Sequence, residues 1–367
     1  MNSDSTLTGL PRIGFEDWVA DQLPPGEDDL IPARVLSVHR EEYLVHTGSD
    51  TLSGQLAGRL AFNASTPLDI PGVGDWVRIR AFSADDLAVI EELIPRRTSL
   101  VRQTAGRRVE FQLIAANLDI AFIMQGLDGD VNVNRLARYL VMAKEGGITP
   151  VVLLSKADLL DNEAITAITD QLFTLDASLN IIPFSNNKPE DVERIAASMR
   201  PGKTHCLLGS SGVGKTTLLN NLLGGEFFAV NEVKEFNRKG KHTTSHRYLQ
   251  ILSSGALLID TPGMRELGSL AIESGLAQTF ADIMVLAESC KFTDCTHETE
   301  PGCAVVEALE RGILARERYD NFQKLSREVK HNEISYHERR RKEKQFGRMV
   351  KRFVKNNRKN FTKFDPD

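Results

Sequence analysis

The chain has few cysteines, no long hydrophobic run and no secretory signal, and each absence excludes a class of protein. Four cysteines in 367 residues are too few for a disulfide-stabilised scaffold. No uninterrupted apolar run is long enough to span a bilayer. The start, Met1-Asn2-Ser3-Asp4, lacks the basic and then apolar pattern of a secretory signal. These absences favour a cytoplasmic globular protein that binds no membrane, and we assume a monomer.

Charge is unevenly distributed along the chain. The formal net charge is −5, yet the segment from Lys330 to Asp367 holds 13 Lys and Arg against 5 Asp and Glu. An acidic body with a basic tail over 331–367 favours contact between the tail and a polyanion. The alternative is a solvated helical tail with no binding role.

The pattern of strands, helices and turns predicts a multidomain protein. A Pro/Gly-rich stretch over 1–30 is typical of a flexible leader. Short alternating runs over 31–100 predict a small β-barrel, OB-like or SH3-like, between which the sequence does not choose. Strands alternate with helices over 101–270, which indicates a mostly parallel α/β sheet. Residues 271–330 are helical with one Cys/His-rich interruption, and the basic tail follows.

A phosphate-binding loop lies in the α/β region. Its residues are Gly209, Ser210, Ser211, Gly212, Val213, Gly214, Lys215 and Thr216, which fit the phosphate-loop pattern between an apolar strand and a helix. Backbone N–H groups of such a loop surround the β-phosphate. We expect Lys215 to contact the β- and γ-phosphates and the Thr216 hydroxyl to ligate Mg²⁺.

Two later segments complete the predicted phosphate site. Asp260 ends an apolar strand, where an aspartate can hold Mg²⁺ through its water shell, and Gly263 can give an N–H to the γ-phosphate. Between the phosphate loop and Asp260 lies a loop with Thr243 and Thr244. Either threonine could close over the nucleotide as a switch, and we take Thr244 as the candidate.

A guanine-reading motif precedes the phosphate loop. In Ser155-Lys156-Ala157-Asp158, the aspartate can accept the N1–H and N2–H donors of guanine, and the lysine stem can cover the purine. Ser155 stands where Asn is usual, so we expect weaker affinity. A backbone N–H at Ser185-Asn186 can reach guanine O6. Because an ordinary small GTPase has its phosphate loop first, this order predicts a circularly permuted domain.

The residue that orients the attacking water is not evident. A Gln follows Asp-x-x-Gly in familiar GTPases, whereas this chain has Met264. We therefore expect slow hydrolysis in isolation, with a residue from elsewhere or from a partner positioning water. His242 in the predicted switch loop is the candidate within this chain, and an exposed loop histidine without a role is the alternative.

Three thiols and one imidazole occur within 14 residues near the C-terminal end of the folded region. Cys290, Cys295, His297 and Cys303 form the Cys₃His set of a closed structural Zn²⁺ site. The fourth cysteine, Cys206, falls in a predicted core strand. One structural Zn²⁺, together with Mg²⁺ bound with GTP, is the expected cofactor set.

The combined order of these motifs resembles that of the RsgA (YjeQ/YloQ) family of bacterial circularly permuted GTPases, which act in late maturation of the small (30S) ribosomal subunit. The segment Phe292–His297 and the segment Glu300–Val305 look especially like the family's zinc segment. The resemblance covers roughly residues 31–330. It departs from the family at Ser155, where Asn is usual, and at Asn186, where Ala is usual.

The resemblance implies an N-terminal OB-fold, a permuted GTPase domain and a helical zinc domain. It implies GTP hydrolysis stimulated by the small subunit, with the outer domains binding ribosomal RNA. It carries guanine binding to Lys156 and Asp158, phosphate binding to Gly209–Thr216, and zinc binding to the four cysteine and histidine ligands. His242 matches the family's switch-loop histidine.

Two other functions remain open from the sequence. One is a GTP-gated RNA-binding scaffold in which hydrolysis is incidental. Met264, at the position where familiar GTPases have Gln, is compatible with this function. The other is an ATPase or small-molecule kinase, against which Asp158 argues. Since permutation places the barrel and the zinc region on either side of the nucleotide site, we predict that GTP reorients one relative to the other.

Overall fold

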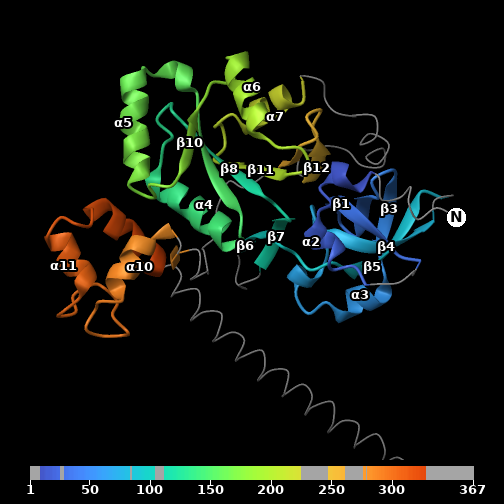
Figure 1. Cartoon of the computed structure of the whole chain (residues 1–367), viewed down its shortest axis with the longest axis horizontal. Coiled ribbons are helices and arrows are strands. Elements are labelled where there is room, and N and C mark those ends of the chain that lie inside the picture. Colours follow the sequence, from blue (N-terminus) through green and yellow to red (C-terminus); the bar gives the residue numbers. More distant parts are fainter. Residues whose placement is uncertain are drawn as a thin grey trace, which may run out of the picture.

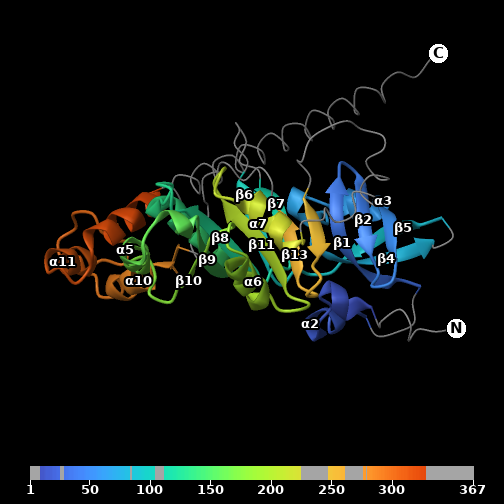
Figure 2. The ribbon, with the colours of Figure 1, turned by 90° about the horizontal axis from the view of Figure 1, so that it is seen from above.

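The computed structural model describes residues 9–24, 29–82, 85–103, 111–224, 247–260, 276–277 and 279–327. A central α/β domain carries a β-barrel at one end and a small helical module at the other (Figures 1 and 2). No helix in these ranges has the length and apolar character needed to cross a membrane.

The barrel is closed by five strands. These are β1 (Ile31–His39), β2 (Glu42–His46), β3 (Thr51–Leu56), β4 (Trp76–Phe82) and β5 (Leu87–Leu93). They follow the order β1-β2-β3-β5-β4, and β4 returns to pair with β1. Strands β3 and β5 run parallel, and helix α3 (Gly58–Asn63) lies between β3 and β4 in the chain. This closed five-stranded arrangement is OB-like.

The central sheet has five parallel strands and one antiparallel strand. In spatial order they are β10 (Asn180–Pro183), β9 (Thr149–Ser155), β8 (Ile120–Gly126), β11 (Thr204–Gly209), β13 (Leu257–Asp260) and β12 (Tyr248–Ile251). Strand β11 is buried along its whole length, which explains its continuous apolar run. The strand that ends at Ser155 therefore precedes the phosphate-loop strand in the chain, as the permuted motif order requires.

Helices cover both faces of the central sheet. Leu136 and Leu140 of α4 (Val133–Glu145) and Leu172 of α5 (Asn162–Phe173) pack into one apolar cluster. Ile195 of α6 (Pro189–Ser198) and Leu218 of α7 (Lys215–Leu222) pack into another, which includes the opposite side chains of the strands. The predicted alternation of strands and helices is confirmed over the described part of this domain, and the strand ends that carry motifs lie at one edge of the sheet.

The barrel and the central sheet form one continuous sheet. Strand β1 pairs with β12 through Ser37 and Tyr248, which joins the two domains edge to edge. A separate two-stranded ribbon of β6 (Ser99–Gln103) and β7 (Phe111–Ala116) lies between the barrel and β8 in the chain. Backbone hydrogen bonding therefore continues from the barrel into the central sheet.

The expectation of a flexible leader over 1–30 is wrong for residues 9–24. Residues Leu10–Ile13 form a 3₁₀ turn, η1, and residues Asp17–Ala20 form helix α2. Leu10, Ile13 and Val19 are fully buried in a cluster with Trp76 of the barrel. Burial of these apolar side chains orders a segment whose Pro and Gly content suggested a loop.

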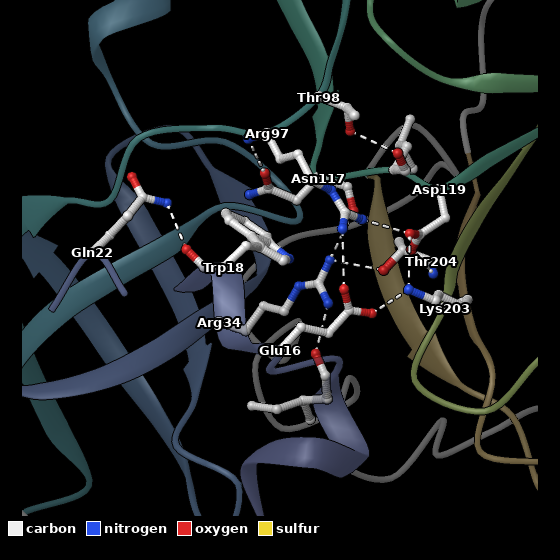
Figure 3. Close-up of polar contacts among 12 residues, drawn as sticks. Glu16, Trp18, Gln22, Arg34, Arg97, Thr98, Asn117, Asp119, Lys203 and Thr204 are labelled. Carbon is white, nitrogen blue, oxygen red and sulfur yellow. Dashed lines mark hydrogen bonds and ion pairs between the residues drawn. The ribbon is translucent and has the colours of Figure 1, made fainter. Parts of the chain in front are cut away.

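A buried arginine joins the N-terminal segment, the barrel and the central sheet (Figure 3). The Arg34 side chain on β1 donates hydrogen bonds to the backbone oxygens of Ile13 (2.6 Å), Gly74 (3.3 Å) and Asn117 (3.2 Å), and to Thr204 Oγ1 (2.8 Å). Burial lowers its pKa to about 10, against the opposing effect of nearby carboxylates, so it stays charged at neutral pH.

An ion-pair network surrounds this arginine, as Figure 3 shows. Arg97 pairs with Glu16 (3.0 Å) and Asp119 (2.5 Å), and Lys203 pairs with the same two carboxylates. Asp119 also accepts the backbone N–H of Thr204 at 2.8 Å. These residues come from the N-terminal segment, the barrel exit and the starts of β8 and β11, so the network holds one end of the sheet.

A second arginine docks the helical module. This module contains α10 (Ala281–Ala287), α11 (Ala304–Glu310) and helical residues 316–327. Arg318 donates to the backbone oxygens of Thr174 and Leu175, just after α5, and to that of Thr279. It also pairs with Asp282. Leu172 and Leu175 share an apolar cluster with Phe280 and Phe322 of the module.

We expect Arg34→Met to destabilise the junction. The change would leave the backbone oxygens of Ile13 and Asn117 and the Thr204 hydroxyl buried without their donor, whereas the Gly74 oxygen keeps the Asn117 amide. We expect a cost of about 3–5 kcal/mol in free energy of unfolding. Urea unfolding followed by tryptophan fluorescence measures this directly, because Trp18 and Trp76, the two tryptophans of the chain, both lie at the junction. Arg59→Met, at an exposed position on α3, is the matched control. Equal effects of the two substitutions would contradict the junction role.

Candidate functional site

The phosphate loop joins β11 to α7 and depends on its glycines. Gly209 ends β11 with a φ of +147°, and a Cβ there would lie 2.6 Å from the Met124 carbonyl oxygen. Gly214 precedes α7 with a φ of +96°, in the left-handed region that a side chain disfavours. These two positions allow the backbone to curl before the helix, so that its first N–H groups face the loop.

The charged residue of the loop lies over the loop backbone. Lys215 Nζ donates to the carbonyl oxygens of Gly209 (2.7 Å) and Ser210 (2.6 Å), while Thr216 is exposed at the start of α7. The Ser210 hydroxyl donates to Asp130 at 2.5 Å, and Asp130 pairs with Arg135. An ammonium and helix N–H groups around one concave loop form an arrangement suited to an anion.

Asp260 lies at the same edge of the sheet. Strand β13 runs parallel to β11, with Ile259 aligned with Cys206, so Asp260 ends one position beyond that pair. Its carboxylate is half-buried at the carboxyl end of its strand. The phosphate loop and Asp260 are thus brought together on neighbouring strands, which is where parallel sheets bind ligands.

The Ser155–Asp158 motif occupies the end of β9, two strands away from the phosphate loop. Lys156 adopts a left-handed φ of +62° and pairs with Asp128, and residues Ala157–Leu159 form the 3₁₀ turn η3. Asp158 is exposed and accepts a hydrogen bond from Asn187 Nδ2 at 3.2 Å. Hydrogen bonding from the Ser185 side chain lowers the Asp158 pKa, so the carboxylate is ionised and can accept two donors.

Three polar residues that contact the predicted site residues were not found from the sequence. Asp128 and Asp130 follow β8, and Asn187 follows β10, each at the carboxyl end of a parallel strand. Their position after strand ends was the signal available in the sequence, because the strands that carry the motifs end at the same edge of the sheet. His242, Thr243, Thr244, Gly263 and Met264 lie outside the described residues.

The cysteine and histidine cluster is assembled around α11. The ligand atoms of Cys290, Cys295, His297 and Cys303 all lie within 4.8 Å of one another, a group that can hold a metal ion. His297 Nδ1 is 3.5 Å from the sulfurs of Cys290 and Cys303, which are 3.8 Å apart. A tetrahedral ion with bonds of about 2.3 Å to sulfur and about 2.0 Å to nitrogen needs separations of about 3.5–3.8 Å.

Neighbouring residues hold the cluster in shape. Cys303 caps the N-terminus of α11, where its sulfur accepts the Val306 N–H. His297 has a left-handed φ of +60°, and its carbonyl oxygen accepts hydrogen bonds from Tyr319 Oη (2.6 Å) and Gln323 Nε2 (3.0 Å). The helical residues 316–327 therefore hold the ligand loop in a backbone conformation that costs free energy for a non-glycine residue.

Known proteins share this sequence and fold. The family model described as RsgA GTPase matches residues 93–270. The small ribosomal subunit biogenesis GTPase RsgA 2 of Vibrio parahaemolyticus is 38% identical over 356 residues, covering 97% of this chain and 95% of that protein. The corresponding GTPase of Xylella fastidiosa is 43% identical over 300 residues, covering 81% and 88%.

Two solved structures share the fold. The crystal structure of YjeQ from Thermotoga maritima matches with a TM-score of 0.62 at 24% identity, covering 82% of this chain and 98% of that one. The crystal structure of YloQ, a circularly permuted GTPase, matches with a TM-score of 0.60 at 25% identity, covering 83% of this chain and 96% of that one. The permuted order predicted from the motifs is therefore confirmed.

We expect Cys295→Ser to abolish metal retention. Loss of one ligand of four opens the coordination shell and weakens binding, and the helical module then loses the cross-link between its loop and α11. Elemental analysis of purified protein should give about one metal ion per chain for the parent and far less for the variant. Cys206→Ala, in the core of β11, is the control and should retain the ion. Equal metal content in parent and Cys295→Ser would contradict the site.

Proposed function

This chain belongs to the RsgA GTPase family, and from that premise we propose that it hydrolyses GTP in the biogenesis of the small ribosomal subunit. The observation that carries the proposal is the assembly of the phosphate loop, Asp158 and Asp260 at one edge of the sheet. The names of these relatives, which are 38–43% identical over most of the chain, support the small subunit as the partner. Work on ribosomal subunits would place the protein in the cytoplasm.

We assign the roles of the site residues from their positions. Asp158 reads the guanine edge, and Lys156 covers the purine while paired with Asp128. Lys215 turns from the loop carbonyls to the phosphates when nucleotide enters. Thr216 and Asp260 would hold Mg²⁺, which supplies charge neutralisation at the phosphates. Gly263, Thr244 and His242 are proposed for the γ-phosphate and water, on the sequence alone.

Zinc is the ion proposed for the Cys₃His cluster. Cys290, Cys303 and His297 lie at tetrahedral separations and Cys295 lies within 4.8 Å of them, and three sulfurs with one imidazole nitrogen are a donor set that zinc prefers. Four protein ligands would leave no position open for catalysis. We infer a structural role, in which the ion fixes the outer face of the helical module. Together with the barrel at the other end, that module would contact ribosomal RNA, and the basic 331–367 tail would add phosphate contacts.

We expect Asp158→Asn to change base preference. An amide in place of one carboxylate oxygen presents a donor to the guanine N–H groups, so affinity for GTP should fall on the order of 100-fold. Affinity for xanthosine triphosphate should rise, because that base has a carbonyl where guanine has an amine. Competition binding against a fluorescent GDP analogue gives both values. Asp161→Asn, which keeps an N-cap for α5, is the control three residues away. An unchanged preference would remove Asp158 from the base site.

The proposed activity is tested by GTP turnover with purified ribosomal subunits. We expect phosphate release to be slow for the protein alone and to rise by one or more orders of magnitude with small subunits, and not with large subunits. The physical reason is that the Gln-equivalent position holds Met264, so a partner must help to order water. Binding of small subunits without stimulation would favour the GTP-gated scaffold, and preference for ATP would favour the kinase or ATPase reading.

A further inference from the structure

The loop between β10 and α6 touches both halves of the nucleotide site. On one side Asn187 contacts Asp158. On the other side, Asn186 contacts the residue before α7 through its side chain, and its carbonyl oxygen accepts from Asn221 of α7 at 3.0 Å. This short loop thus spans from the base-reading carboxylate to the phosphate-loop helix.

Ser155 makes a direct bond from the base motif to the phosphate loop. Its side chain is fully buried, and its hydroxyl lies 2.7 Å from the Val213 carbonyl oxygen and 3.3 Å from that of Gln125. A hydroxyl carries one hydrogen and can donate to one of these oxygens at a time. The shorter contact identifies Val213 as the main acceptor, so this side chain makes a single hydrogen bond to the phosphate loop.

Asn186 bonds the next carbonyl in the loop. Its Nδ2 donates to the Gly214 oxygen at 3.2 Å. A Cβ placed on Gly214 would lie 2.7 Å from that nitrogen, so a side chain at position 214 would force this amide to shift. The Asn186 Oδ1 atom is buried without a hydrogen-bond partner among the described residues. Holding an unpaired acceptor there costs free energy, which indicates that the side chain is fixed by the other contact.

We propose that Ser155 and Asn186 form a split clamp, two positioning residues that hold the consecutive carbonyls of Val213 and Gly214. The asparagine usual at position 155 carries two N–H donors on one side chain. In this chain the two donors are divided between a serine and a second residue from the neighbouring strand end. The clamp fixes the phosphate loop relative to the base motif directly before Lys215. This inference rests on the guanine-nucleotide function proposed above.

The clamp acts on how long nucleotide stays bound. It touches backbone atoms of the phosphate loop and not the reacting atoms, so its loss should mainly speed nucleotide dissociation. The two positions should also depend on each other. Position 155 is fully buried, so the larger side chain of Ser155→Asn should be poorly accommodated, and its amide would compete with Asn186 for the Gly214 oxygen. Removal of the Asn186 amide frees that oxygen.

The test is a mutant cycle read by dissociation of a fluorescent GDP analogue in the full-length protein. We expect Asn186→Ala to raise the dissociation rate about five- to tenfold, the loss of one neutral hydrogen bond in a partly buried site. Ser155→Asn alone should weaken binding similarly. The double variant should return to within about twofold of the parent, a non-additivity that independent sites do not show. Asn220→Ala, on the exposed side of α7, is the matched control.

Two results would overturn the clamp. One is an Asn186→Ala dissociation rate equal to that of Asn220→Ala. The other is a double variant no better than Ser155→Asn, because a general loss of packing accumulates and is not rescued. Binding is measured without ribosomal subunits, so an absence of subunit-stimulated hydrolysis leaves this result standing, whereas failure of the parent to bind GDP overturns both proposals.

Discussion

The structure depends on the burial of one guanidinium. A charged group removed from water is costly unless its donors are satisfied, and Arg34 is satisfied only by oxygens from several parts of the chain. Those oxygens come from η1, from the turn before β4, and from the starts of β8 and β11. The N-terminal segment, the barrel and the central sheet must therefore be in place together for Arg34 to be buried with all its hydrogen bonds made.

The residues that attach the outer modules lie away from the residues of the nucleotide site. Thr204 begins β11 and Gly209 ends it, so the arginine contact lies about 17 Å along the strand from the phosphate loop. Arg318 attaches the helical module in the same way, by donating hydrogen bonds to backbone oxygens, including that of Thr174 just after α5. Both outer modules are thus held by arginines on carbonyl groups away from the loop residues, which keeps the nucleotide edge of the sheet accessible.

Periodicity and spacing predicted the elements whose side chains repeat regularly. The runs at β9, β11 and β13 are buried on both faces, and the motifs at their ends fixed the fold class and the edge that forms the site. Strand β3 has a weak pattern in the sequence, because Ser53 and Gly54 interrupt its alternation. The folding of residues 9–24 and the contacts of Arg34 depend on partners distant in sequence, which periodicity does not report. The sequence shows Asn186 as a departure from the family, where Ala is usual, but its bond to Gly214 depends on how the fold brings the two residues together.

The registers of the sheet give the permuted order a physical meaning. Tyr248 of β12 is aligned with Ser37 of the barrel on one side and with Asp260 on the other. The proposed magnesium aspartate is therefore only two strand spacings, about 10 Å, from the barrel edge. The chain beyond Asp260 leads to the helical module. A displacement at Asp260 would reach the barrel through a row of paired strands. Because the barrel is paired strand to strand with this sheet, whereas the helical module is held by side-chain contacts such as those of Arg318, the reorientation predicted from the motif order should be carried mainly by the helical module.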